Sequence, residues 1–293
     1  MRSIRKLYFQ NAAGDRKSLN GDGGVYATDL SGFGFSLDPS FADLSRGFFP
    51  VVKDDAEPQN ALAFTIVLTK AAYTTHQQLM DWLAAAGSLT IVYNPTGKQE
   101  YFRDVTVNYV QKGELNQVGW LELPFSLSCK TPWYLPTPTS LSMSSAGSGN
   151  RMRYPYRYTK DLRYSAGSSA TLRALVSGTG HIPGALALTV RGALTNPRVK
   201  LVGNVSGKTY GICKVSTVLN ETDILQFSSR YEDSFVRKIL EDGTAEDLLD
   251  DLDLAATPFF HIPVNEPCVL TVESDAPFSG RAELLIYYYF RSV

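Results

Sequence analysis

The chain holds three histidines, His76, His181 and His261, the side chains best suited to acid–base chemistry at neutral pH. A Ser–His–Asp arrangement needs a histidine beside a nucleophile, and the sequence has no Gly-x-Ser-x-Gly turn to expose one. His181 and His261 each precede Ile-Pro, a pattern typical of a strand-to-loop junction. We therefore predict structural roles for the histidines, no catalytic residues, and a protein that is not an enzyme.

The glycine-rich segments depart from the motif that binds dinucleotides. Gly178-Thr-Gly180 is followed by Pro183 where the motif needs its third glycine, and no strand-turn-helix pattern surrounds it. Gly32-Phe-Gly34 also lacks the motif. These segments predict no cofactor-binding residues.

An acidic run is the segment that best suggests a calcium loop or a glycosidase carboxylate pair. Its members are Glu241, Asp242, Glu246, Asp247, Asp250, Asp251 and Asp253. The run lacks the alternating Asp/Asn spacing of a calcium loop. We interpret it as a solvated surface and predict no metal site.

The cysteines, Cys129, Cys213 and Cys268, lie far apart in the sequence. No Cys-x-x-Cys pair suggests zinc, and their odd number argues against a disulfide framework. We expect three buried, reduced thiols.

The segment Arg151–Lys160 interleaves basic and aromatic residues, which is the composition of a surface that binds single-stranded nucleic acid. Alternating tyrosines are also typical of a half-buried strand whose arginine stems cover apolar surface, and we favour that interpretation. Carbohydrate-binding modules use exposed aromatic side chains on β-sandwiches. The 16 tyrosines therefore keep sugar binding open as an alternative.

Length and composition favour two globular domains. The 293 residues are about twice a usual domain of ~150 residues. A content of 44% hydrophobic and 19% charged residues excludes a disordered chain, and no apolar run reaches the ~20 residues of a membrane helix. The net charge of −1, balanced between the halves, argues against binding polyanions by bulk charge. We expect neither a secretory signal nor membrane insertion.

The segment Leu62–Leu68 is predicted to be a strand, because its apolar residues recur at every second position. The opposite face, Ala63, Thr65 and Val67, is also uncharged. We infer that an adjacent subunit or another protein covers part of this face.

A helix is predicted from about Thr75 to Ala86, with one apolar stripe that includes Leu79 and Trp82. Thr75 and Gln78 form a capping-box pattern at its start. Gly87 supplies the residue that can adopt a left-handed cap at its end.

A hairpin and one further strand complete the first half. Leu89–Tyr93 and Glu100–Val110 flank the turn Asn94-Pro-Thr-Gly97 and form the predicted hairpin. In Leu121–Cys129 apolar and polar residues alternate, so we predict one buried and one wet face. Pro124 predicts an edge position or a bulge.

We place domain boundaries at 1–135 and 151–293, because residues 136–150 are rich in Pro, Ser, Thr and Gly and read as a linker or surface loop. Short strands recur beyond the linker and predict a β-sandwich. They are Thr171–Ser177, Ala185–Arg191, Arg198–Val202, Thr209–Val215, Asp223–Ser228, Phe235–Leu240, Val269–Ser274 and Ala282–Phe290. Asp242-Gly243 predicts a tight turn, and Glu246–Leu254 a short helical turn.

Several different short motifs follow one another in a characteristic order along nearly the whole chain. In the first half they are Leu7-Tyr-Phe-Gln-Asn11 with Gly14, Leu30-Ser-Gly-Phe-Gly34, Arg103-Asp-Val105, Lys112-Gly-Glu114 and Thr131-Pro-Trp133. In the second half they are Gly178-Thr-Gly180, Ile182-Pro183, Thr195-Asn-Pro197 and the aromatic strand Leu284–Phe290. In this order they resemble the distal tail proteins of siphophages, especially of those infecting Gram-positive bacteria.

The resemblance implies a fold that is mainly β with one helix (α+β): an N-terminal β-sandwich-like ring domain and a C-terminal galectin-like β-sandwich. It implies a structural protein of the virion tail tip or baseplate, a homo-hexameric ring that joins the tail tube to the host-adhesion apparatus. The implied partners are the tail tube protein, a tail-associated fibre or hub protein, and a receptor-binding protein. DNA only passes through the lumen, for which a near-neutral N-terminal half is suitable. The alternative is a carbohydrate-binding module for host-surface recognition.

Overall fold

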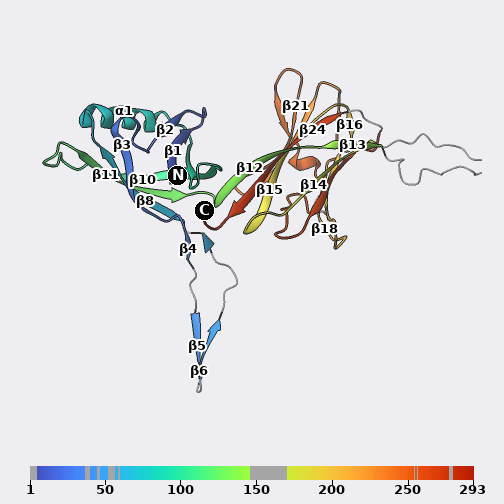
Figure 1. Cartoon of the computed structure of the whole chain (residues 1–293). Helices are drawn as coiled ribbons and strands as arrows, with labels where there is room; N and C mark the ends of the chain where they lie inside the picture. Colours follow the sequence, from blue (N-terminus) through green and yellow to red (C-terminus); the bar gives the residue numbers. More distant parts are fainter. Residues whose placement is uncertain are drawn as a thin grey trace, which may run out of the picture. The chain divides into compact units, whose positions relative to one another are not determined.

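The computed structural model describes residues 5–36, 40–44, 47–51, 57–58, 60–145, 170–253, 255, 257–276 and 280–293. The chain forms two compact units, which we call unit 1 (residues 1–135 and 289–293) and unit 2 (residues 136–288). The chain passes from unit 1 into unit 2 within β12 (Trp133–Ser140) and returns to unit 1 within β24 (Arg281–Phe290) (Figure 1). The described residues are mainly β, in antiparallel sheets, with one α-helix, and this confirms the predicted fold class.

Unit 1 is built on an antiparallel sheet with the strand order β2-β1-β9-β10-β11-β8-β3. Its elements are β1 (Lys6–Asn11), β2 (Arg16–Ser18), the 3-10 turn η1 (Asp22–Gly24), β3 (Val25–Ser31), β8 (Ala61–Leu68), α1 (Ala72–Ala84), β9 (Leu89–Asn94), β10 (Tyr101–Val110) and β11 (Leu121–Cys129). The predicted β9–β10 hairpin is confirmed. Its turn is held by Asn94, whose Oδ1 accepts a hydrogen bond from the Gly97 amide at 2.6 Å.

The core of unit 1 lies against one face of this sheet. In β8 and β11 the apolar residues at alternate positions are buried, as predicted, because successive side chains of a strand point to opposite faces. Phe9, Phe64 and Phe125 meet at the centre, with ring centroids 5.8 to 5.9 Å apart. Phe290 and Val293 of the returning C-terminus pack against the same core. The sequence-based division had placed these residues in the C-terminal domain.

Helix α1 covers this core with buried Leu79 and half-buried Trp82. The helix begins at Ala72, so the predicted start at Thr75 is wrong, and Ala71 makes no side-chain cap. The Thr75 hydroxyl instead donates a hydrogen bond to the Lys70 carbonyl at 2.9 Å. The earlier start is favoured by the burial of Ala72. Gly87 has the left-handed conformation that was expected after the helix.

The prediction that Pro124 marks an edge strand is wrong. Strand β11 pairs with β8 on one side and with β10 on the other, and the register shift lies in β10, between Val107 and Tyr109. The Pro124 carbonyl accepts a hydrogen bond from the amide of Gln111, which follows the last residue of β10. Since the amide and carbonyl of one strand residue point to the same side, the missing Pro124 amide faces the end of β10, where little pairing is lost.

Between β3 and β8 the chain forms two successive pairs of strands that the sequence did not predict. Strand β4 (Phe35–Ser36) pairs with β7 (Glu57–Pro58), and β5 (Ser40–Leu44) pairs with β6 (Gly47–Val51). In Figure 1 the β5–β6 hairpin follows the β4–β7 pair towards the tip. We call these two pairs of strands the arm.

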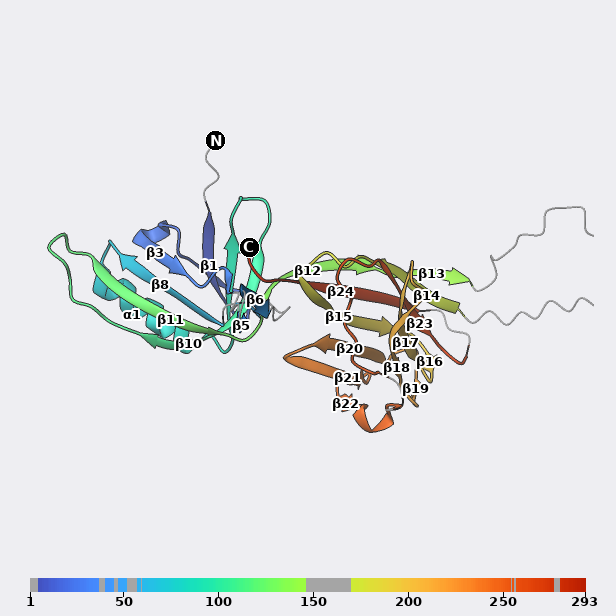
Figure 2. The same ribbon diagram turned by 90° about the horizontal axis from the view of Figure 1, so that it is seen from below.

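Unit 2 contains two main antiparallel sheets, one with the order β12-β24-β15-β20-β21-β22 and one with the order β13-β14-β23-β17-β18. Its further elements are β13 (Ser142–Ser145), β14 (Ala170–Val176), β15 (Ile182–Arg191), β16 (Leu194–Thr195), β17 (Arg198–Gly203), β18 (Thr209–Lys214), β19 (Val218–Leu219), β20 (Ile224–Arg230), β21 (Asp233–Ile239), β22 (Ala245–Asp247), the 3-10 turn η2 (Leu249–Asp251) and β23 (Cys268–Glu273). Figure 2 shows β15, β20, β21 and β22 side by side. Every strand predicted beyond residue 170 has a counterpart.

Part of the predicted linker, residues 136–150, is not a loop. Residues 136–140 continue β12, and Ser142–Ser145 form β13, which pairs with β14. The serines and threonines of this segment therefore belong to strands. A Pro/Ser/Thr composition is tolerated there because β12 and β13 each lie at the edge of their sheet in unit 2. Residues 146–150 and the segment Arg151–Lys160 lie outside the described residues.

Cys213 and Cys268 are buried in unit 2, whereas Cys129 is half-buried, and all three are free thiols. Burial raises the pKa of Cys213 to about 12 and that of Cys268 to about 11. A raised thiol pKa means that both groups are neutral at pH 7. Among the described residues, none of the helices has the length and apolar character needed to span a bilayer.

The phenylalanine cluster makes a direct prediction about unit 1. Phe125→Ala should lower the free energy of unfolding of unit 1 by about 3–5 kcal/mol, because Phe125 is 2% exposed and contacts two other rings. Tyr109→Ala, at 57% exposure on a neighbouring strand, should change it by less than about 0.5 kcal/mol. Tryptophan fluorescence in urea measures this, since Trp82, Trp120 and Trp133 all belong to unit 1. Equal unfolding midpoints for the two variants would contradict the assigned core.

Candidate assembly surface

The guanidinium of Arg103 is buried in unit 1 at the point where two segments leave the core. Arg103 is 1% exposed, and its Nε donates a hydrogen bond to the Thr131 carbonyl at 2.9 Å. Its Nη1 donates to the Gly32 carbonyl at 3.5 Å. Burial lowers the pKa of Arg103, but a guanidinium stays charged at any ordinary pH. Arg103 therefore ties the segment before the arm to the segment before β12.

Aromatic rings close around this guanidinium. Arg103 lies over the ring of fully buried Trp133, 5.4 Å from its centroid. Phe33 stacks on Trp133 at 5.4 Å and meets Tyr93 edge-on at 5.0 Å. The neighbouring Asp104 accepts hydrogen bonds from the hydroxyl groups of Thr90 (2.7 Å) and Tyr134 (2.9 Å). Three motifs that are far apart in sequence, around residues 30–34, 103–105 and 131–133, thus form one cluster, which we call the Arg103 anchor.

Gly32 is the backbone position that the Arg103 anchor depends on. Its φ of +84° lies in the left-handed region, and a Cβ at this position would collide with the carbonyl oxygen of Ala61. Only glycine allows the chain to pass this close to the start of β8.

Across β3, β8 and β11, the paired rows on the other face of the sheet are nearly free of charge. The register places in successive rows across β3, β8 and β11 the residues Tyr26–Val67–Glu122, Thr28–Thr65–Pro124 and Ser31–Ala63–Ser126. Among these residues Glu122 is the charged one. We call this surface the uncharged face. Its middle strand is the one whose second face the sequence predicted to be covered by a partner.

One end of the uncharged face is apolar and exposed. A hollow there is lined by Tyr26, Thr28, Val67, Thr69 and Trp120. Tyr26 is 44% and Trp120 is 41% exposed. Asn116 fixes the loop that carries Trp120 through two hydrogen bonds. The Asn116 Oδ1 accepts one from the Trp120 backbone amide at 2.9 Å, and the Asn116 backbone amide donates the other to the Trp120 carbonyl at 2.9 Å. Exposed aromatic residues held by a rigid backbone are typical of interface anchors.

Sequence reasoning identified the middle strand of this face but missed Tyr26 and Trp120. Their place beside Val67 follows from pairing between β3, β8 and β11, which no local pattern reveals.

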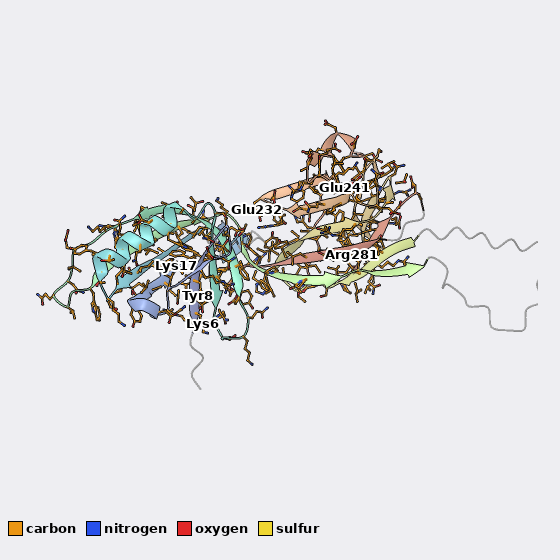
Figure 3. The ribbon with its side chains drawn as sticks, turned by 90° about the horizontal axis from the view of Figure 1, so that it is seen from above. Lys6, Tyr8, Lys17, Glu232, Glu241 and Arg281 are labelled. Carbon is orange, nitrogen blue, oxygen red and sulfur yellow. The ribbon has the colours of Figure 1, made fainter. Side chains whose placement is uncertain are left out.

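The opposite edge of the sheet is charged. Figure 3 labels Lys6, Tyr8 and Lys17 close together on β1 and β2. Arg16 of β2 lies over the Tyr8 ring and makes a paired hydrogen bond to Glu100, with both N–O distances 3.0 Å. Charge on an edge strand disfavours unwanted strand pairing. The uncharged face is therefore the better surface for a partner.

The histidines and the acidic run belong to other elements than the strands of this surface. His76 is on α1, and burial and Lys112 lower its pKa. His181 and His261 are in unit 2, where His261 stacks on Tyr231 at 4.1 Å. The acidic residues occupy exposed turns around β22 and η2, and several accept backbone amides there. Within the described part of the chain, no group of three His, Cys, Asp or Glu residues is placed to hold a metal.

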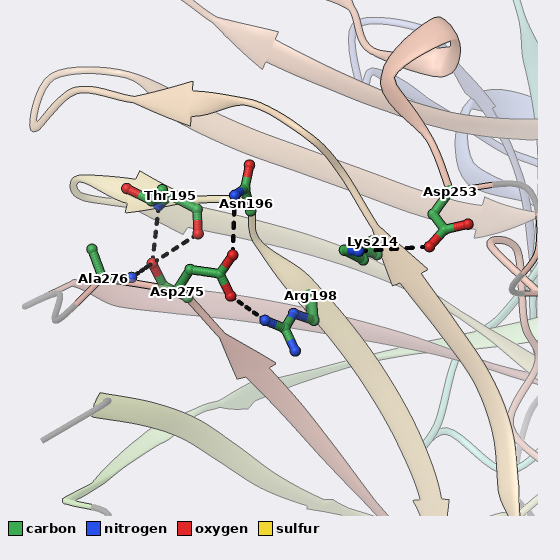
Figure 4. A network of polar contacts seen from close by, with 8 residues as sticks. Thr195, Asn196, Arg198, Lys214, Asp253, Asp275 and Ala276 are labelled. Atoms are coloured by element: carbon green, nitrogen blue, oxygen red, sulfur yellow. Dashed lines mark hydrogen bonds and ion pairs between the residues drawn. The ribbon is translucent and has the colours of Figure 1, made fainter. Parts of the chain in front are cut away.

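The polar residues of unit 2 in Figure 4 satisfy one another. Asp275 accepts hydrogen bonds from the Asn196 amide group (3.0 Å) and from Arg198, and both lower the pKa of Asp275. Lys214 pairs with Asp253 at 3.7 Å. The pocket beside this network is lined by Thr171, Arg198, Glu273, Ser274 and Asp275, without an aromatic ring. The network fixes the β16–β17 loop, where Asn196 has a positive φ, to the end of β23.

Comparison with known families gives one match within unit 1. Residues 6–130 match the model of the distal tail protein, N-terminal domain. No curated protein matches the chain.

Two solved structures share the fold of the whole chain. One is a chain of the phage P2 baseplate in its activated conformation with Ca, which is 16% identical to this chain, with a TM-score of 0.66. The alignment covers 99% of this chain and 100% of the baseplate chain. The other is the SPP1 Dit protein, described as a paradigm of hub adsorption apparatus in phages that infect Gram-positive bacteria. It is 9% identical, with a TM-score of 0.55, and 96% of this chain covers 98% of it.

Gly32 makes a prediction about the Arg103 anchor. Gly32→Ala should lower the free energy of unfolding of unit 1 by more than about 3 kcal/mol, because it adds a backbone collision to an unfavourable φ. The control Gly97→Ala has a similar φ of +77° but open space around it. It should cost only the roughly 1–2 kcal/mol of the left-handed conformation. Chemical denaturation followed by tryptophan fluorescence compares the two, and equal losses would mean that the close approach at Ala61 is absent.

Proposed function

We propose that this chain, which belongs to the distal tail protein family through residues 6–130, forms a homo-hexameric ring at the distal end of a phage tail. The chain is a structural component of the phage tail tip. In this proposal residues 1–135 form the ring domain, which continues the tail tube, and the ring encloses the channel through which DNA passes. The observation that carries the proposal is the uncharged face of unit 1, with Tyr26 and Trp120 exposed at its end.

Ring closure sets a geometric requirement that unit 1 is suited to meet. A closed ring needs a head-to-tail interface, in which two different patches of one rigid body face each other. A stable interface buries roughly 1,200–2,000 Å² in total. The strands of the uncharged face supply one such patch, and the Arg103 anchor makes the body that carries it rigid.

The C-terminal sandwich, residues 151–293 in the sequence-based division, is proposed to face outward towards a tail-associated fibre or hub protein and a receptor-binding protein. The support is the shared fold of the baseplate chain and of the hub protein SPP1 Dit. The near-neutral charge of the chain suits a channel in which DNA has to slide, since fixed basic contacts would hold the phosphates.

We propose a structural role rather than an enzymatic one. The alternative of a carbohydrate-binding module is not favoured by unit 2. Among the described residues of unit 2, the exposed aromatic side chain is that of Tyr231. One face of its ring is already stacked on His261 and so is covered. Two residues that line the polar pocket beside the network of Figure 4, Arg198 and Asp275, already pair with each other.

The ring is tested by native mass spectrometry and negative-stain electron microscopy of the purified full chain. We expect a species of six times the 32.2 kDa chain mass and ring-shaped particles. Because the proposed interface is uncharged, the ring should persist when ionic strength rises from about 0.1 to 0.5 M, although this screens surface ion pairs strongly. A monomer at every concentration tested, or a ring that dissociates in salt, would contradict the proposal.

A further inference from the structure

We propose that Asn20 is a site of spontaneous deamidation that the fold of unit 1 keeps closed, and that its conversion to aspartate or isoaspartate opens the sheet there irreversibly. Asn20 is followed by Gly21, and this is the one place in the sequence where asparagine precedes glycine. Glycine has no Cβ to hinder the approach of its own backbone nitrogen to the preceding carboxamide. Asn20 is therefore the most reactive asparagine of the chain when the chain is unfolded.

The reaction consumes water and needs no other reactant. The Gly21 backbone nitrogen forms a bond to Cγ of Asn20, the Cγ–Nδ2 bond breaks, and ammonia leaves with the proton of the Gly21 amide. The product is a succinimide ring, which water then opens at either of its carbonyl carbons. Breaking the new Cγ–N bond gives aspartate, and breaking the original peptide bond gives isoaspartate. No atom is oxidised or reduced.

In the folded chain the half-buried Asn20 carboxamide is held by hydrogen bonds at both of its ends. Its Oδ1 accepts a hydrogen bond from the Leu7 backbone amide at 2.6 Å. Its Nδ2 donates to the Leu7 carbonyl at 2.9 Å and to the Ser18 hydroxyl at 3.0 Å. The carboxamide thus pairs with Leu7 of β1 as the backbone of a neighbouring strand would. We call these three hydrogen bonds the Asn20 clamp.

The attacking nitrogen is held as well. The Gly21 amide donates a hydrogen bond to the Val25 carbonyl at 2.7 Å, and Asn20 forms an antiparallel bridge with Tyr26. The Tyr26 ring also lies against Gly21, since a Cβ at Gly21 would be 2.5 Å from it. Ring closure requires the backbone to rotate until the Gly21 nitrogen faces Cγ of Asn20. Because this rotation breaks the clamp and the Gly21 hydrogen bond together, the reaction proceeds only from a locally opened state.

The clamp lies where β1 is joined to β3. Next to it the Leu19 amide donates to the Leu7 carbonyl at 3.0 Å, and the Ala27 amide donates to the Leu19 carbonyl at 2.9 Å. Deamidation replaces the donor Nδ2 by an oxygen, so the Leu7 carbonyl loses one of its two donors and faces a carboxylate instead. Isoaspartate also lengthens the backbone, which shifts the bridge to Tyr26. Neither product can rebuild the clamp, and the change therefore reaches a residue of the uncharged face.

The reactivity is tested in the full-length Asp242→Asn variant, which carries a second asparagine–glycine pair as an internal control. Residue 242 lies in an exposed turn of unit 2, and Gly243 has a φ of +86°. The Asp242 Oδ1 accepts the Thr244 amide at 2.8 Å, and an asparagine keeps that acceptor. The variant is incubated folded and, in parallel, unfolded in guanidinium chloride at the same pH and temperature. Mass spectrometry of the peptides that contain residues 20 and 242 then gives the rate of deamidation at each position.

In the unfolded chain the two positions should react at similar rates, because each precedes glycine. Folding should slow the reaction of Asn20 at least roughly 100-fold, since it then waits for the clamp to open, and should slow that of residue 242 less than roughly tenfold. Equal rates at the two positions in the folded chain would show that the clamp does not close the site. Slow reaction of Asn20 in the unfolded chain would show that it is not the reactive position.

The irreversible opening is tested with Asn20→Asp, which is one of the two products. The control is Asn108→Asp on β10, where the Asn108 Oδ1 accepts the Ser128 hydroxyl at 2.8 Å, a role that a carboxylate keeps. Hydrogen–deuterium exchange in residues 6–11 and 19–27 should be at least roughly tenfold faster in Asn20→Asp than in the wild type, and unchanged in Asn108→Asp. Unchanged exchange in Asn20→Asp would mean that the clamp is rebuilt after deamidation. Equally fast exchange in both variants would assign the effect to the added charge, and either result would overturn the inference.

Discussion

A buried charge fixes the geometry of unit 1. Removing the Arg103 guanidinium from water is costly, and the cost is offset only if its donors find acceptors in place. The carbonyls of Thr131 and Gly32 and the ring of Trp133 meet this need. These partners lie on two segments, around Gly32 and around Thr131–Trp133, so the guanidinium is satisfied only when both segments are in position. The arm and β12 therefore leave the unit from fixed points.

This rigidity connects the fold to assembly. A ring closes only if each subunit presents its two patches at a constant angle, and an angle is constant only on a rigid body. The phenylalanine cluster fills the interior of unit 1, while the paired rows on the opposite face of β3, β8 and β11 consist of uncharged side chains apart from Glu122. The chemistry of this surface is that of an interface rather than of an active site. That agrees with the match of residues 6–130 to the distal tail protein, N-terminal domain.

The sequence predicts local elements well and long-range ones poorly. Strands β8 and β11 follow from alternation of apolar residues, and the β9–β10 hairpin follows from its turn residues. The helix start was misplaced because burial of Ala72 outweighs the cap at Thr75. Residues 136–145 looked like a linker because edge strands tolerate Pro and Ser, and the return of Phe290 to unit 1 has no local signal. The Arg103 anchor was visible only as separate motifs, whose meeting point is set by the tertiary fold.

The central claim is that one guanidinium holds together the segments that leave unit 1 and so makes unit 1 a rigid body. Hydrogen–deuterium exchange of Arg103→Met against the wild type tests it most directly, since exchange reports local opening segment by segment. The account predicts faster exchange in residues 29–34 and 130–134, with α1 and unit 2 unchanged. Unchanged exchange in both segments, or a uniform rise throughout unit 1, would contradict it.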